Sequence, residues 1–110
     1  MKLSIKKDDL LAGLQKVQAA VAGRTTLPVL GNILVQTEGE KLRITASDLA
    51  MTVSATVSAI VGEEGATTLP AKRLFAIVRE MAGTEIELET NERDVTTIKS
   101  ASAVFQLNGI

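Results

Sequence analysis

The alternation of hydrophobic and polar positions divides the chain into two similar halves. In the first half, "KLSI" and "KLRITASD" alternate in the way that half-buried strands do, and so does the longer stretch from Met51 to Ala59. Between the first two segments, apolar residues recur at helical spacing from Leu10 to Val21 and predict a helix with one core-facing side. The apolar run "LGNILVQ" follows the helix and predicts a buried strand.

The second half repeats this order after the polar segment "VGEEGA", which we interpret as a loop. The short strand "ATTL" leads to Pro70, which suits a helix start, and "AKRLFAIVREM" then carries apolar residues at helical spacing. Three more predicted strands follow, in "TEIELET", "DVTTIKS" and "AVFQLNGI". Each half therefore reads strand, helix, strand, strand, strand.

The two halves align residue by residue. An offset of 64 superimposes the apolar positions of the two helices and carries Ile5 to Leu69, and an offset of 53 carries Ile33 to Ile86. Chance periodicity is the alternative, but helix falling on helix and strand on strand favours a duplication. A duplicated β-α-β-β-β unit predicts an α+β fold whose two helices pack side by side on antiparallel sheets.

Length and composition indicate one domain without a membrane span. A chain of 110 residues fits a single core, and no stretch approaches the roughly 18 consecutive apolar residues that a membrane helix needs. The start, "MKLSIKKDDLL", lacks the unbroken apolar region of a signal peptide, and the absence of Cys fits a reducing compartment. We expect a cytoplasmic protein.

The charge balance restricts any contact with nucleic acid to a local surface. A formal net charge of −1 argues against binding by the whole surface, but it allows one basic face. Phe75 and Phe105 are the only aromatic residues, so a platform for stacking single-stranded bases is not expected.

Catalytic patterns are not found in the sequence. Without His or Cys there is no imidazole base and no thiolate ligand, and the glycines form no phosphate-binding motif. The acidic pairs Asp8-Asp9 and Glu63-Glu64 could hold Mg²⁺, but a helix start and a solvated loop explain them better. We therefore expect no enzymatic activity, no metal site and no cofactor.

The remaining candidates are basic side chains near the two predicted helices. The exposed side of the first helix carries Lys16, and that of the second carries Lys72, Arg73 and Arg79. Arg24 lies in the loop that leaves the first helix. Taken singly, each is explained as an ordinary solubilising charge. Taken together, they predict a weakly basic helical side.

Four stretches resemble a known family. "DDLLAGLQKVQAAVAGRTTLPVLGNILV", "LRITASDLAMTV", "GATTLPAKRLFAIVRE" and "TIKS" are similar to the N-terminal domain of the bacterial DNA polymerase III β subunit, the sliding-clamp family. The resemblance covers essentially the whole chain, and "RTTLPVLGNILV" and "LPAKRLFAIVRE" are its most specific parts.

The resemblance implies a processivity factor without catalytic activity, which encircles duplex DNA and tethers the replicative polymerase through non-specific phosphate contacts. In the family, three domains form a subunit and two subunits close head-to-tail, with the helices lining the hole. By this similarity Arg24 and Lys72 fall where basic residues face DNA, and Arg73 and Lys16 lie on the same side.

The last predicted strand departs from the family pattern. It reads "SASAVF", so Ser102 and Val104 stand where the family usually has arginines. Phe105 and Leu107 match the apolar residues that pack across the family's subunit interface, and the alternative is that they are simply core. We predict a subunit interface that involves Val104, Phe105 and Leu107 and has lost its ion-pairing part.

The chain stops after "LNGI", where the family continues into a second domain. We therefore expect residues 1–110 to be the first domain of a three-domain clamp, with the cleft for polymerase and clamp loader in later domains. A second possible function is an isolated interaction module that self-associates through the uncharged strand "AVFQL", because an unpaired apolar edge promotes association.

Overall fold

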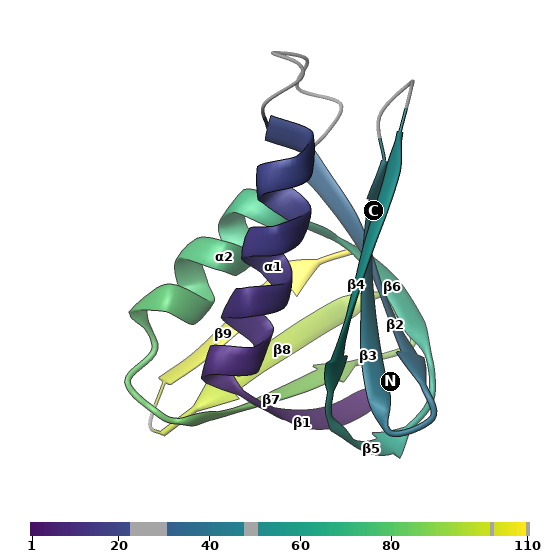
Figure 1. Ribbon diagram of the computed structural model, residues 1–110. Coiled ribbons are helices and arrows are strands. Elements are labelled where there is room, and N and C mark those ends of the chain that lie inside the picture. The colour runs from purple at the N-terminus through teal and green to yellow at the C-terminus, as the bar shows by residue number, and fades with distance from the viewer. Residues whose placement is uncertain (23–30, 48–50, 102, 110) are drawn as a thin grey trace.

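The computed structural model describes residues 1–22, 31–47, 51–101 and 103–109, so Arg24 and Ser102 lie outside the described residues. The described part contains two helices and nine strands (Figure 1). The helices are α1 (Lys7–Ala22) and α2 (Ala71–Glu80), and the strands are β1 (Lys2–Lys6), β2 (Asn32–Glu38), β3 (Lys41–Ser47), β4 (Thr52–Ser58), β5 (Ile60–Glu63), β6 (Ala66–Pro70), β7 (Glu85–Thr90), β8 (Val95–Ser100) and β9 (Ala103–Asn108).

Both helices form where the apolar spacing predicts them. Pro70 is the last residue of β6 and caps the start of α2 with an extended backbone, φ −69° and ψ 119°, so it lies one residue before the first helical turn in which the sequence placed it. The helices bury equivalent positions of the repeat, Leu10 and Leu14 on α1 and Leu74 and Val78 on α2. Burial of these stripes fixes which sides of the helices remain in water.

The strands form two antiparallel sheets, and each sheet combines both halves of the repeat. One sheet has the order β5-β1-β7-β8-β9 and the other the order β4-β3-β2-β6. Ile5 lies opposite Ile86 in the first sheet, and Leu69 lies opposite Ile33 in the second. The two offsets relate Ile5 to Leu69 and Ile33 to Ile86, so they carry the pairing in one sheet onto the pairing in the other, and the predicted duplication is confirmed. The halves exchange their first strands and are thereby interlocked.

The segment between the halves differs from the expected loop. Ile60–Glu63 forms β5, which pairs antiparallel with β1 and places Val61 opposite Leu3. This pairing occupies backbone groups of β1 that would otherwise form an open sheet edge. The strand is short and contains Gly62, so its alternation is too brief to be distinguished from a polar loop in the sequence.

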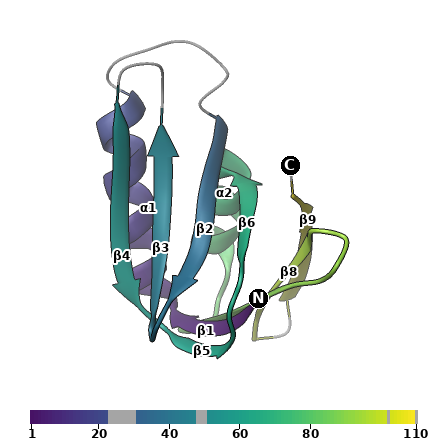
Figure 2. The same cartoon turned by 90° about the vertical axis from the view of Figure 1, so that its right-hand side faces the viewer.

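The helices lie side by side on one side of the molecule. In Figure 1 both stand in front of the sheet that contains β7, β8 and β9 and to the left of the other sheet, and in Figure 2 both lie behind the sheet formed by β4, β3, β2 and β6. α1 contacts α2 directly and packs against β3 and β4. The predicted α+β arrangement is therefore confirmed. Among the described residues, the structure contains no helix with the length and hydropathy of a membrane span.

Candidate nucleic-acid interface

The outward sides of α1 and α2 form one surface, which we call the helical face. Its residues are exposed because the buried stripes turn the opposite sides of both helices toward the core. The small residues Ala12 and Ala76 lie away from the helix ends, Lys16 lies near the middle of α1, and the other charged residues of this surface lie near the helix ends. The helical face comprises Asp8, Ala12, Gln15 and Lys16 on α1 and Lys72, Arg73, Ala76, Arg79 and Glu80 on α2.

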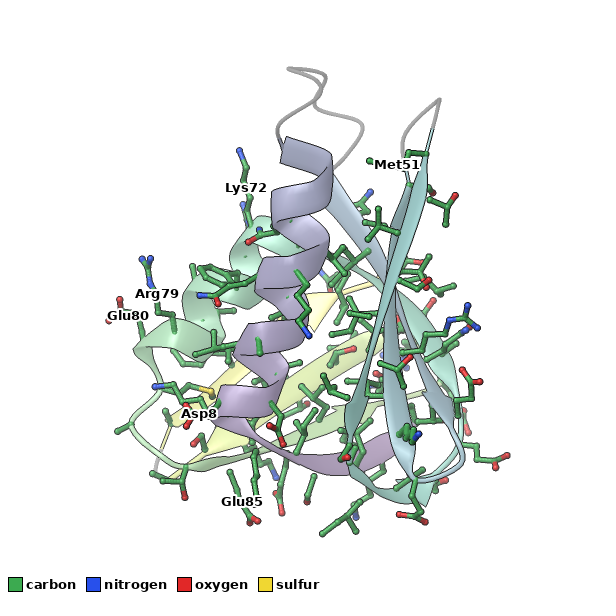
Figure 3. The ribbon with its side chains drawn as sticks, in the orientation of Figure 1. Asp8, Met51, Lys72, Arg79, Glu80 and Glu85 are labelled. Atoms are coloured by element: carbon green, nitrogen blue, oxygen red, sulfur yellow. The ribbon has the colours of Figure 1, made fainter. Side chains whose placement is uncertain are left out.

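Lys72 and Arg73 occupy the first turn of α2, which contains no acidic residue. The first turn of a helix carries unpaired N–H groups and the positive end of the helix dipole. Two cations there are unfavourable for the helix itself, but they add to the field that attracts an anion to this end. Figure 3 shows Lys72 projecting from α2 into open space. This end of the helical face is suited to attract phosphate groups.

The candidate cations are not engaged in ion pairs within the described part of the chain. The ion pairs found there join Lys2 to Glu89, Arg43 to Glu38 and Arg79 to Glu80. Lys16, Lys72 and Arg73 belong to none of them, and all three are exposed.

Arg79 differs from the other cations of the helical face because it is held by its own helix. Its guanidinium carbon lies 5.7 Å from the ring centroid of Phe75, and its Nε lies 4.0 Å from a carboxylate oxygen of Glu80. Arg79 therefore has an anionic neighbour within its own helix, unlike Lys72 and Arg73.

Lys7 fixes the relative direction of the two helices. Its Nζ donates a hydrogen bond to the carbonyl oxygen of Met81, just after α2, and its backbone N–H donates to the carbonyl oxygen of Thr84 at 2.8 Å. The start of α1 therefore lies beside the end of α2. Figure 3 accordingly shows Asp8 and Lys72 at opposite ends of the helical face.

β9 provides the second candidate surface. Val104 is 58% exposed and Phe105 is 41% exposed, whereas Leu107 is 8% exposed and packs in the core. Phe105 lies opposite Ile98 and Val104 opposite Lys99, so the two exposed apolar side chains lie on different faces of the sheet. Leu107 contributes to the core of this chain, and the interface role of all three residues stays a prediction.

The sequence patterns did not single out Asp8 as part of a charged surface. They explained Asp8 and Asp9 as a helix start, although the offset of 64 that carries α1 onto α2 also carries Asp8 onto Lys72. This alignment of an acidic residue with a basic one was the signal in the sequence that the two helix starts differ in charge. Among the residues that the structure describes, no cluster of three acidic side chains could hold a metal ion.

Comparison with known proteins identifies the family. The family described as "DNA polymerase III beta subunit, N-terminal domain" matches residues 1–110. The chain belongs to this sliding-clamp family. The beta sliding clamp of Synechocystis sp. is 39% identical over 118 residues, and that of Escherichia coli K12 is 37% identical over 110 residues. These matches cover 100% and 98% of this chain, and the chain spans 30% of the length of each of these relatives.

Solved clamp structures share the whole fold of the chain. The sliding clamp of Caulobacter crescentus superposes with a TM-score of 0.87 at 34% identity, and that of Bacillus subtilis with a TM-score of 0.88 at 29% identity. Both superpositions cover 100% of this chain, and 30% and 31% of the respective clamp chains. The resemblance found in the sequence is therefore confirmed. Membership in the sliding-clamp family favours a clamp domain over an isolated interaction module.

Proposed function

We propose that this chain is one domain of a DNA sliding clamp, which encircles duplex DNA and tethers the replicative polymerase without catalysing a reaction. The observation that carries the proposal is the pair of exposed, unpaired cations Lys72 and Arg73 on the first turn of α2. The match of residues 1–110 to the sliding-clamp family supports a role for this basic surface in contact with DNA. A clamp of this kind acts on chromosomal DNA, so we propose that the protein is located in the bacterial cytoplasm.

Phosphate attraction without base readout suits a protein that has to slide. Each strand of the duplex presents a negative charge about every 3.4 Å along the axis, so a flexible basic side chain can leave one phosphate and find the next. Lys16 on α1 extends the basic surface formed by Lys72 and Arg73, and we propose that Arg24 adds to it. Contacts to phosphate carry no sequence information. The ring then retains the DNA by topology, and each contact can stay weak.

We propose that β9 pairs with an edge strand of another clamp subunit, in a head-to-tail ring. β9 is the last strand of its sheet and has a partner on one side only within the described chain. Val104 stands where the resembling family usually has an arginine, so the contact in this chain depends on apolar burial. Polymerase and clamp loader would bind the full-length protein through its later domains.

A charge-reversal experiment tests the DNA contact. In the variant Lys72→Glu/Arg73→Glu, two phosphate contacts are replaced by repulsion, so we expect the variant to bind a short fluorescent duplex more weakly than the control does at low salt. The control Lys41→Glu/Arg93→Glu makes the same change in net charge at exposed positions outside the helical face. We expect wild-type binding to be weaker than about 10⁻⁴ M and to fall linearly with the logarithm of salt concentration.

The same titration in varied salt measures the number of contacts. Each lost phosphate contact lowers the slope of log K against log salt by about 0.9, so we expect a difference of nearly two such steps between control and test variant. Equal losses in both double variants, or submicromolar and base-specific binding by the wild type, would contradict the proposal.

A further inference from the structure

The two ends of the helical face carry opposite charges at equivalent positions. The offset of 64 that relates the halves carries Asp8 to Lys72 and Asp9 to Arg73. Asp8 and Asp9 lie in the first turn of α1, as Lys72 and Arg73 lie in the first turn of α2. Because the start of α1 lies beside the end of α2, the acidic and basic positions are found at opposite ends of one surface (Figure 3).

The carboxylate of Asp8 is available to act on a molecule outside the chain. Its side chain is exposed, and it takes part in no ion pair within the described residues. The neighbouring cation Lys7 directs its ammonium group to the carbonyl oxygen of Met81. Arg79, at the end of α2, is paired with Glu80. Among the described residues, neither Lys7 nor Arg79 forms an ion pair with Asp8.

We infer that Asp8 acts as an electrostatic barrier, which confines the phosphate backbone of a duplex to the end of the helical face that carries Lys72 and Arg73. The inference rests on the proposed function, because it concerns the same duplex on the same surface. A duplex carries a negative charge about every 1.7 Å of its axis, so phosphates approach both ends of a surface that it crosses. Asp8 repels those within a Debye length of about 8–10 Å.

The barrier keeps the contact local and weak. The end of the helical face near Asp8 also carries the Arg79–Glu80 pair, so its charges sum to −1, whereas the other end carries the two cations Lys72 and Arg73. The helical face therefore attracts phosphates at the end that carries Lys72 and Arg73. A sliding protein needs such a limit, because a second basic end would add phosphate contacts and raise the affinity that movement has to overcome. Asp8 thus lowers affinity for DNA, which is opposite to the effect expected of an interface residue that binds.

A structural explanation of Asp8 predicts a different result. A carboxylate in the first turn of a helix stabilises that helix through the dipole, so removing it lowers the melting temperature whether or not DNA is bound. A purely structural role would leave the affinity for DNA unchanged or would reduce it. The barrier predicts an increase in affinity in a variant that is slightly less stable.

The experiment compares Asp8→Asn with the matched control Glu92→Gln, which removes one negative charge from the exposed turn between β7 and β8, outside the helical face. Both variants are titrated with a short duplex of mixed sequence at low salt, and melting curves establish that they are folded. We expect Asp8→Asn to raise the association constant about two- to five-fold above that of the control, as removal of one charge near several phosphates implies. Asp8→Lys should raise it further and steepen the salt dependence by about 0.9.

The variant Lys72→Glu separates the two claims. If Lys72→Glu weakens binding while Asp8→Asn and Glu92→Gln bind equally well, the barrier is refuted and the DNA contact stands. If Lys72→Glu binds as tightly as wild type, the proposed function fails, and the inference about Asp8 fails with it. An increase that is confined to the Asp8 variants, together with a loss in Lys72→Glu, supports both.

Discussion

Lys72 and Arg73 occupy positions where their charges oppose the stability of their own helix. The first turn of a helix favours carboxylates, and α1 carries Asp8 and Asp9 there, as its dipole requires. α2 has cations at the two equivalent positions and no acidic residue in its first turn. In a duplicated unit this contrast is informative, because one copy shows the arrangement that suits folding and the other departs from it. The two cations at the start of α2 are therefore better explained by binding of an anion from outside the chain.

Replacing Lys72 with Glu should therefore make the isolated chain more stable. We expect the free energy of unfolding to rise by about 0.3–1 kcal/mol, because a cation at the positive end of the dipole is exchanged for an anion. Chemical denaturation at low salt measures the change, and high salt should reduce it. Asp8→Lys is the matched reversal on α1 and should lower stability. A Lys72→Glu chain that is less stable than wild type would show that Lys72 has a structural role that the contacts do not reveal.

At the scale of elements, β9 differs from most edge strands because no charged residue protects it. "AVFQLN" contains neither Lys nor Glu, its outer edge has no partner within the described chain, and two of its apolar side chains are exposed. Natural edge strands usually carry charges that prevent pairing with other chains. An unprotected edge is consistent with a strand that has a partner in the assembled protein.

Phe105→Asp should reduce association of the chain with itself. We expect the wild type to show a mass above that of a monomer in light scattering at high protein concentration, because exposed β9 edges pair. A carboxylate on this edge should restore the monomer mass. Ile60→Asp is the control, since Ile60 is 69% exposed on β5, the opposite edge strand of the same sheet. Monomer mass in the wild type, or an equal effect of both variants, would contradict the proposed role of β9.

The elements with long periodic patterns could be predicted from the sequence, and the short ones could not. Both helices and the duplicated unit follow from apolar spacing and from the two offsets, whereas the exchange of the first strands between the sheets was not predicted. β5 was missed because four residues with a glycine leave no clear alternation. The position of Leu107 could not be decided either, because alternation gives a shared face but not whether a helix or another chain covers it. In the structure Leu107 is covered within its own chain.

At the scale of the whole molecule, interlocking of the halves explains how the helical face is held. β1 belongs to the sheet of the second half and β6 to the sheet of the first, so neither half can separate from the other without breaking a sheet. Lys7 adds a direct link from α1 to the segment after α2. The helices are therefore supported from both sheets, and their outward sides stay at a fixed relative direction.

The candidate site could be predicted only in part. The sequence placed Lys16, Lys72 and Arg73 on exposed helix sides, and the structure brings both helices into one surface. The spacing alone did not reveal that opposite ends of this surface carry opposite charges, because that depends on the direction in which the helices pack. Arg24 lies outside the described residues, and its contact with DNA stays a prediction.

The most direct test of the account is an NMR titration of the isotope-labelled chain with a short duplex at low salt. The account predicts that chemical-shift changes concentrate at Lys16, Lys72 and Arg73 and their neighbours on the helical face, and that they disappear as salt is added. Changes centred on the outer faces of the two sheets, or changes that persist in high salt, would contradict it.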